Sequence, residues 1–117
     1  MNPIVREDCL RILNQVPLQD LKERSVLLTG ANGLFGSYLV QLFSLCKSEL
    51  NIPLSLHCIS RHGPRQELAP LVDGTSIMWH SRDLTEPIVF KEPVHYILHA
   101  ACYGQPRLWM EDKLKTI

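Results

Sequence analysis

Residues 29–36 read Thr29-Gly30-Ala31-Asn32-Gly33-Leu34-Phe35-Gly36, a glycine-rich stretch between two apolar segments. The five residues before it, Ser-Val-Leu-Leu-Thr at 25–29, are almost entirely apolar without alternation, which is typical of a strand buried on both faces of a parallel sheet. From Gly33 to Cys46, apolar residues recur with the period of one helical face. The stretch therefore predicts a tight turn between a buried strand and an amphipathic helix.

The three glycines fit a turn that holds a dinucleotide pyrophosphate. Gly30 lets the chain turn sharply off the strand, Gly33 leaves room for phosphate beside backbone N–H groups, and Gly36 lets the helix pack closely on the strand. The N–H groups and the helix dipole at the start of the helix favour the phosphates. The alternative is a tight turn with no ligand. The candidate cofactor-binding residues in this turn are Gly30, Asn32, Gly33, Leu34, Phe35 and Gly36.

The rest of the chain continues the alternation of helices and strands. We predict helices over residues 3–16, 33–46 and 65–72, a further helix from about residue 107, and strands over residues 25–29, 54–60, 76–80 and 94–101. Parallel strands need crossover connections, and right-handed crossovers place the four strands in the order 3-2-1-4. The expected fold class is therefore α/β, with a Rossmann-type parallel sheet and flanking helices.

Composition narrows the function classes. The 117 residues contain 12 Lys and Arg against 12 Asp and Glu, so the chain has no basic field for nucleic acid and no polybasic stretch for a membrane surface. No apolar run is long enough to span a bilayer, and the amino terminus does not resemble a signal peptide, so we expect a cytoplasmic protein. The four cysteines are widely spaced in apolar segments and are expected to be reduced core residues: Cys9, Cys46, Cys58 and Cys102.

The spacing Thr-Gly-x-x-Gly-x-x-Gly resembles that of the extended short-chain dehydrogenase/reductase family, in particular its nucleotide-sugar epimerases, dehydratases and decarboxylases. The resemblance implies that Asp83 and Leu84 contact the adenine, with the Asp83 carboxylate accepting from the amino group. It also implies that Ala100 and Ala101, in a segment similar to the family's His-x-Ala-Ala, lie against the ribose on the nicotinamide side. Taken alone, Asp83 could also be an ordinary loop acid.

Residues 100–116 bear on which subfamily of nucleotide-sugar enzymes the chain resembles. The order of residues 100–106, then Trp109-Met110 and finally Leu114-Lys115-Thr116, is similar to that in UDP-glucuronate decarboxylases, with dTDP-glucose 4,6-dehydratases close behind. Trp109-Met110 stands where the decarboxylases have Asn-Pro. The resemblance covers residues 25–117, which divides the chain into an N-terminal helix and connection (1–24) and an incomplete NAD(P)-binding Rossmann domain (25–117).

Arg61 bears on which cofactor binds. In NAD-binding versions of the fold an acid at the end of the second strand binds the ribose 2′-hydroxyl, whereas an Arg can receive the 2′-phosphate of NADP. This chain has Ser60-Arg61-His62 at that position and no acid. The resemblance implies tightly held NAD, so NAD is the expected cofactor, with NADP possible. Arg61 could also be a solvated side chain at a strand exit.

The catalytic pair of the family is not within the sequence. The resemblance implies a Tyr and a Lys four residues apart, yet the residues four after Tyr38, Tyr96 and Tyr103 are Leu, Ala and Arg. We therefore expect the chain to be the N-terminal, catalytically inert portion of a nucleotide-sugar-modifying enzyme whose Tyr/Lys pair lies beyond residue 117. The alternative is a non-catalytic nucleotide-binding or interaction module with the same fold. The expected partners are a nucleotide-sugar substrate for the complete enzyme and a second copy of the chain, which would pair through the open edge of the last strand.

Other polar groups have simpler interpretations. His57, Cys58 and His62 are close in sequence, but His57 and Cys58 point to opposite faces of a strand and no second pair gives zinc spacing, so no metal site is expected. Trp109 with Arg107 could stack on a uridine, although a Trp on an amphipathic helix more often belongs to packing.

Overall fold

The first helix begins where the sequence predicts. In the computed structural model, which describes residues 2–83, 85, 87, 89, 90 and 92–100, helix α1 spans Pro3–Gln15. The Asn2 side chain accepts a hydrogen bond of 2.8 Å from the N–H of Ile4 and caps the helix. A single 3-10 turn, η1 (Gln19–Leu21), leads from this helix to the sheet.

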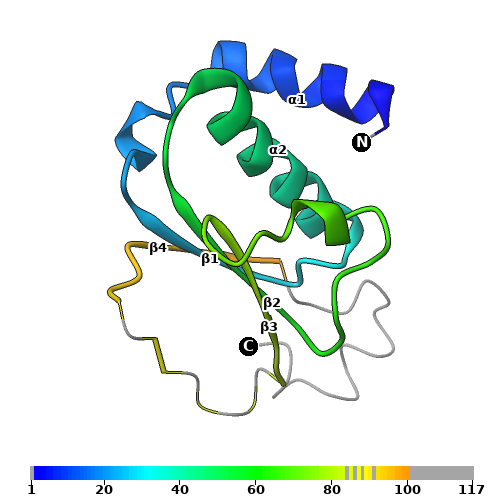
Figure 1. The fold of residues 1–117 in the computed structure, drawn as a ribbon, viewed down its shortest axis with the longest axis vertical. Helices are drawn as coiled ribbons and strands as arrows, with labels where there is room; N and C mark the ends of the chain where they lie inside the picture. The colour runs from blue at the N-terminus through cyan, green and yellow to red at the C-terminus, as the bar shows by residue number, and fades with distance from the viewer. Residues whose placement is uncertain (1, 84, 86, 88, 91, 101–117) are drawn as a thin grey trace.

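Four parallel strands form the sheet in the predicted order, β3-β2-β1-β4. Their bounds are β1 Ser25–Thr29, β2 Ser55–Ser60, β3 Ile77–Ser81 and β4 Tyr96–His99. The β1 strand lies in the centre, because it pairs with β2 on one side and with β4 on the other. The fold is therefore an α/β, Rossmann-like fold, as predicted (Figure 1).

Helix α2 (Leu34–Leu50) connects β1 to β2 and covers one face of the sheet. In Figure 1 it lies between α1 and the strands. Its Val40 and Cys46 belong to the same hydrophobic core as Val26 and Leu28 of β1, and all four side chains are essentially inaccessible to solvent. The helix ends at Asn51, whose left-handed backbone (φ 54°) lets its N–H bond the carbonyl of Cys46.

The opposite face of the sheet is buried unevenly. His57 and Ile59 of β2 are buried on it. On β4, Ile97 is 65% exposed and Tyr96, on the other face, is 45% exposed. No strand among the described residues pairs with the outer edge of β4. Among the described residues, this edge is therefore unpaired and carries exposed apolar side chains.

Several predicted boundaries need correction. Residues 65–72 do not form an α-helix: only the 3-10 turn η2 (Ala69–Leu71) is present, because Pro70 has no N–H to donate to a helix that starts at residue 65. The third strand starts one residue later than predicted, at Ile77, and the Asp73 carboxylate binds the N–H groups of residues 75–77 at this point. The fourth is shorter than predicted, since it pairs with β1 only as far as Thr29. The predicted helix from residue 107 lies outside the described residues.

The described cysteines are core residues, as predicted. Cys9, Cys46 and Cys58 are free thiols and all three are buried, while Cys102 lies outside the described residues. Burial raises the pKa of Cys46 to about 11 and that of Cys58 to about 12, so both stay protonated near neutral pH. In the part of the chain that the structure describes, no helix is both long and apolar enough to cross a membrane.

Candidate functional site

The candidate site lies where the order of the strands reverses. From β1 the chain moves through β2 to β3 on one side, and then crosses to β4 on the other side of β1. In open α/β sheets, ligands bind at the carboxyl ends of the strands beside such a reversal. The glycine-rich turn starts at this point, because Gly30 directly follows β1.

Two glycines of the turn have conformations that a side chain would prevent. Gly30 has a left-handed backbone (φ 70°), which reverses the chain at the end of β1. A Cβ added to Gly36 would lie 2.0 Å from the carbonyl oxygen of Gly30. Helix α2 therefore packs directly on the backbone of the turn, as the sequence predicts, and its first turn lies at the end of the central strand.

The start of α2 presents backbone donors at the carboxyl edge of the sheet. Gly33 is the N-cap and supplies no side-chain hydrogen bond to the helix. The first N–H groups of an α-helix have no acceptor within the helix, so they are available to an anion. The Leu34 and Phe35 side chains on this first turn are 79% and 70% exposed. Large apolar side chains this exposed give a ligand apolar surface beside the donors.

A second polar pair lies between the two strands at the reversal. The Thr29 hydroxyl and Nδ1 of His99 are 2.7 Å apart, and these residues end β1 and β4 in matched register. The next residue, Ala100, donates its N–H to the carbonyl of Thr29 at 3.1 Å and is half-buried. The sequence analysis missed His99, because only the pairing of the strands places it beside Thr29.

The Asn32 side chain binds the protein rather than facing outward. Its Nδ2 donates to the hydroxyl of Ser60 at 3.2 Å and to the carbonyl of Gly63 at 2.9 Å, while its Oδ1 accepts from the N–H of Arg65 at 3.0 Å. Both N–H bonds of the amide are thus used within the chain. The predicted role of Asn32 as a cofactor contact is therefore limited to its backbone, and its side chain fastens the loop after β2 to the glycine-rich turn.

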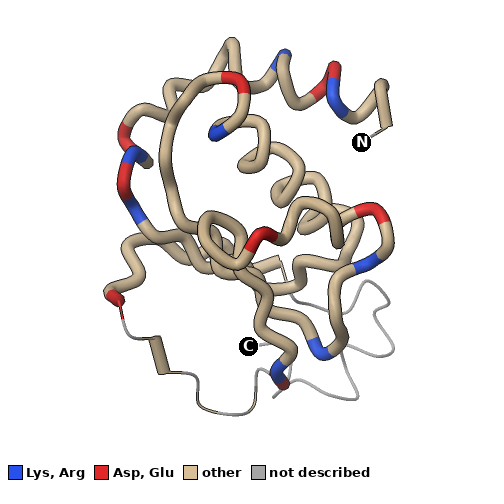
Figure 2. Tube along the Cα trace, viewed as in Figure 1, with Lys and Arg blue, Asp and Glu red and all other residues tan. Residues whose placement is uncertain are grey.

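Two arginines belong to this loop. Arg61 follows β2 directly and is exposed. The guanidinium of Arg65, a residue that the sequence analysis did not select, donates from Nη1 to the backbone carbonyl of Asn32 at 3.2 Å. It also pairs through Nε with Glu67 at 3.0 Å. Figure 2 shows Lys or Arg on the loop after β2 and again just past β3, with an acidic residue near them in both places, so charges of both signs lie along this edge.

The predicted adenine contact, Asp83, lies two residues past β3 at the same edge. Its Oδ1 accepts from the N–H of Thr85 at 3.0 Å and from the Thr85 hydroxyl at 2.9 Å. This is the bonding of an Asx turn, which shapes the loop. Leu84 and Ala101, the other residues assigned by resemblance, lie outside the described residues.

The structure groups two histidines on the sheet face opposite α2. Nδ1 of His57 and Nε2 of His80 are 3.1 Å apart, and the Phe90 ring packs edge-on against both imidazoles. Burial and the neighbouring imidazole lower the pKa of His57, and burial and Arg82 lower the pKa of His80. No group of three potential ligands that could hold a metal ion is found within the described ranges.

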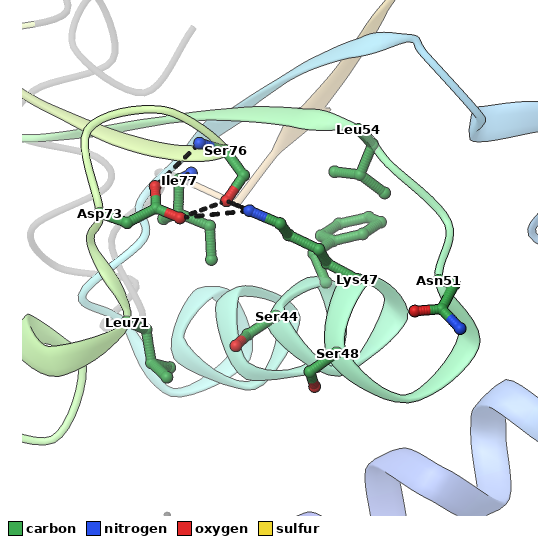
Figure 3. Close-up of a pocket in the computed structure, with 10 residues that line it drawn as sticks. Ser44, Lys47, Ser48, Asn51, Leu54, Leu71, Asp73, Ser76 and Ile77 are labelled. Carbon is green, nitrogen blue, oxygen red and sulfur yellow. Dashed lines mark hydrogen bonds and ion pairs between the residues drawn. The ribbon is translucent and has the colours of Figure 1, made fainter.

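A hollow of about 280 Å³ lies at the opposite end of the sheet, between α2 and the residues that lead into β3 (Figure 3). Lys47 reaches across it, donating to the Ser76 hydroxyl at 3.0 Å and pairing with Asp73 at 3.6 Å. Burial opposes ionisation of Asp73, but hydrogen bonds from the Ser76 hydroxyl and from the N–H groups of residues 75–77 outweigh it, and the net effect lowers its pKa. These polar groups bind one another, so the Lys47–Asp73–Ser76 contacts form a brace that joins α2 to the start of β3.

Comparison of the chain with protein-family models, with curated proteins and with solved structures finds no match. The assignment of the site therefore depends on its geometry and on the residues that form it.

Proposed function

We propose that this chain binds a nicotinamide dinucleotide, with the pyrophosphate at the first turn of α2, and that it is the dinucleotide-binding portion of a nucleotide-sugar-modifying enzyme. The observation that carries the proposal is the packing of Gly36 against Gly30, which fixes the start of α2 at the end of the central strand. A turn of this kind at the strand-order reversal is the usual pyrophosphate site of Rossmann-like folds.

Residues along the carboxyl edge of the sheet match the successive parts of a dinucleotide. The first turn of α2 would receive the phosphates. The end of β2 and the turn at Asp83 would face the adenosine, and the Thr29–His99 pair lies on the side of β4, where the nicotinamide half would extend. When bound, the nicotinamide ring supplies the chemistry of accepting and returning a hydride.

The enzymatic part of the proposal rests on the resemblance of residues 29–36 to nucleotide-sugar enzymes. Within the 117 residues no Tyr is followed four positions later by Lys, so these residues would supply cofactor binding rather than proton transfer. Reading the gene downstream of codon 117 checks this assignment. A Tyr-x-x-x-Lys sequence there supports the enzyme, and its absence favours the non-catalytic module.

The binding proposal is tested with the variant Gly33→Val. Gly33 is exposed and its φ is −70°. An added Cβ would lie 3.3 Å from the carbonyl oxygen of Gly30, so this carbonyl must shift by a few tenths of an ångström to admit the branched side chain, which then fills space beside the helix donors. We expect calorimetric titration to show NAD(H) or NADP(H) binding to the wild-type chain and a loss of about tenfold or more in the variant, because a direct contact with a charged group is worth about 1.5–3 kcal/mol. Circular dichroism of both proteins controls for folding. Equal affinities in the two proteins would refute the assignment.

A further inference from the structure

The loop after β2 is fixed by side chains from the glycine-rich turn and from β3. Asn32 in the glycine-rich turn holds it through Ser60, Gly63 and Arg65, as described above. From β3, Nε1 of Trp79 donates to the carbonyl of His62 at 3.0 Å. A loop with hydrogen bonds to the turn and to a neighbouring strand has a defined path, so the arginines it carries have defined positions.

The orientation of the Asn32 amide follows from its partners. The carbonyl of Gly63 can only accept and the N–H of Arg65 can only donate, so Nδ2 must face the former and Oδ1 the latter. The amide therefore joins two segments 33 residues apart with every N–H used. Removing it would leave the loop free to move away from the turn.

Arg65, in the loop after β2, contacts the glycine-rich turn directly. Its backbone N–H and its guanidinium bind the side chain and the backbone carbonyl of the same residue, Asn32. Among the described residues, its carboxylate partner is Glu67, in a pair whose side chains are 51% and 49% exposed. Exposed pairs of this kind contribute about 0–1 kcal/mol, so an incoming anion of higher charge can displace Glu67.

The charge on this loop favours a ligand with a 2′-phosphate, such as NADP, over NAD. An acid at the end of β2 would bind the ribose 2′-hydroxyl of NAD and repel a phosphate on that oxygen, but Ser60 occupies the end of β2 and Arg61 follows it. A phosphate monoester carries about −1.5 to −2 charges near neutral pH and binds guanidinium groups through paired hydrogen bonds. Arg61 and Arg65 on one fixed loop suit such a group.

On the basis of the proposed function, we propose that the ligand is a 2′-phosphorylated dinucleotide, that Arg61 and Arg65 bind its 2′-phosphate, and that Asn32 is the positioning residue that holds both arginines over the phosphate-binding turn. Glu67 occupies Arg65 in the free protein and is displaced when the 2′-phosphate binds.

The test is calorimetric titration of the 117-residue chain and its variants with NADP⁺ and, separately, with NAD⁺. For Arg65→Ala we expect NADP⁺ affinity to fall by about ten- to a hundredfold, since a hydrogen bond to a charged group is lost, while NAD⁺ affinity changes by less than about twofold. Asn32→Ala should lower NADP⁺ affinity similarly. The loss in the double variant should be well short of the product of the two single losses, because Asn32 acts through Arg65. Arg24→Ala removes one exposed positive charge at the other end of β1 and should leave both affinities unchanged.

Glu67→Gln provides a variant that does not disturb the loop. Because Glu67 is half-exposed and contacts only the Arg65 side chain in this network, the variant should fold normally. It should bind NADP⁺ about two- to fivefold more tightly, the range of an exposed ion pair, and bind NAD⁺ as before.

The possible outcomes separate this proposal from the proposed function. Equal affinity for NADP⁺ and NAD⁺, or variants that change both affinities by the same factor, would overturn the 2′-phosphate assignment and leave dinucleotide binding standing. Tightening of NADP⁺ binding by Glu67→Gln with no effect of Asn32→Ala would overturn the positioning role of Asn32. Binding of neither dinucleotide to the folded wild-type chain would refute the proposed function, and this proposal with it.

Discussion

Replacing Gly36 with alanine should destabilise the protein, although the same change usually stabilises a helix. The added methyl carbon would lie 2.0 Å from the carbonyl oxygen of Gly30, 2.8 Å from its carbonyl carbon and 2.9 Å from the Cα of Ala31. Side-chain Cβ atoms essentially never approach another heavy atom more closely than 3.0 Å, so α2 and the turn must separate by about 1 Å. All three obstructing atoms belong to the backbone, so no rotamer change can relieve the contact.

The expected net cost follows from two opposing effects. Overpacking that forces a backbone shift costs about 1–3 kcal/mol, and the upper end applies here because the obstruction is rigid. Alanine recovers at most about 1 kcal/mol of helix propensity. The free energy of unfolding should therefore fall by about 2 kcal/mol, and the midpoint of thermal unfolding by about 6–10 °C for a chain of this size.

Urea and thermal unfolding followed by circular dichroism measure both quantities, and Gly63→Ala is the matched control. An added Cβ at Gly63 has nothing within 4 Å. That variant should change the free energy of unfolding by less than about 0.5 kcal/mol or raise it slightly. Gly36→Ala as stable as the wild-type chain would show that α2 does not pack on the turn in this way, and would remove the main observation behind the proposed site.

Three further predictions concern stability and association. The pKa values of His57 and His80 are lowered in the folded state, so the unfolded state binds more protons at acidic pH. The free energy of unfolding should therefore be highest above about pH 6.5 and should fall as the pH drops below it. Thermal unfolding midpoints measured from pH 7.5 to 5 should fall, and they should fall less in His57→Phe. Midpoints that change equally with pH in the two proteins would show that the histidine pair is not the cause. Asp73→Ala should lower the free energy of unfolding by about 1 kcal/mol, as loss of a capping carboxylate does, and urea midpoints no different from wild type would contradict the brace. Because Ile97 is 65% exposed on an uncovered edge strand, sedimentation should show concentration-dependent self-association that Ile97→Lys abolishes, whereas a wild-type monomer at tens of micromolar would refute it.

The sequence predicts the centre of the sheet well because several patterns in neighbouring residues favour the same structure. The uninterrupted apolar run of β1, the glycine spacing after it and the helical period of α2 all favour the same strand–turn–helix unit. The bounds of β1 match residue by residue, because both its neighbours pair with its whole length or nearly so.

The contacts that shape the candidate site depend on the path of the chain. Asn32 meets Arg65, and Thr29 meets His99, across 33 and 70 residues. Neither contact has a local pattern that would reveal it. Gly63 and Pro64 are residues typical of a loop, but their presence does not predict that the loop after β2 returns to the glycine-rich turn. The prediction of a helix over residues 65–72 is wrong because Pro70 lacks the N–H that such a helix would need.

The central claim, that residues 30–36 bind the pyrophosphate of a dinucleotide, is tested most directly by an amide ¹H–¹⁵N NMR titration of the assigned chain with NADP⁺ and with NAD⁺. We predict that the largest shift changes fall on the backbone amides of residues 30–37, with smaller changes near Arg61 and none at Lys47 and Asp73 in the hollow at the other end of the sheet. Saturating shift changes confined to that hollow, or no saturable change at residues 30–37, would contradict the claim.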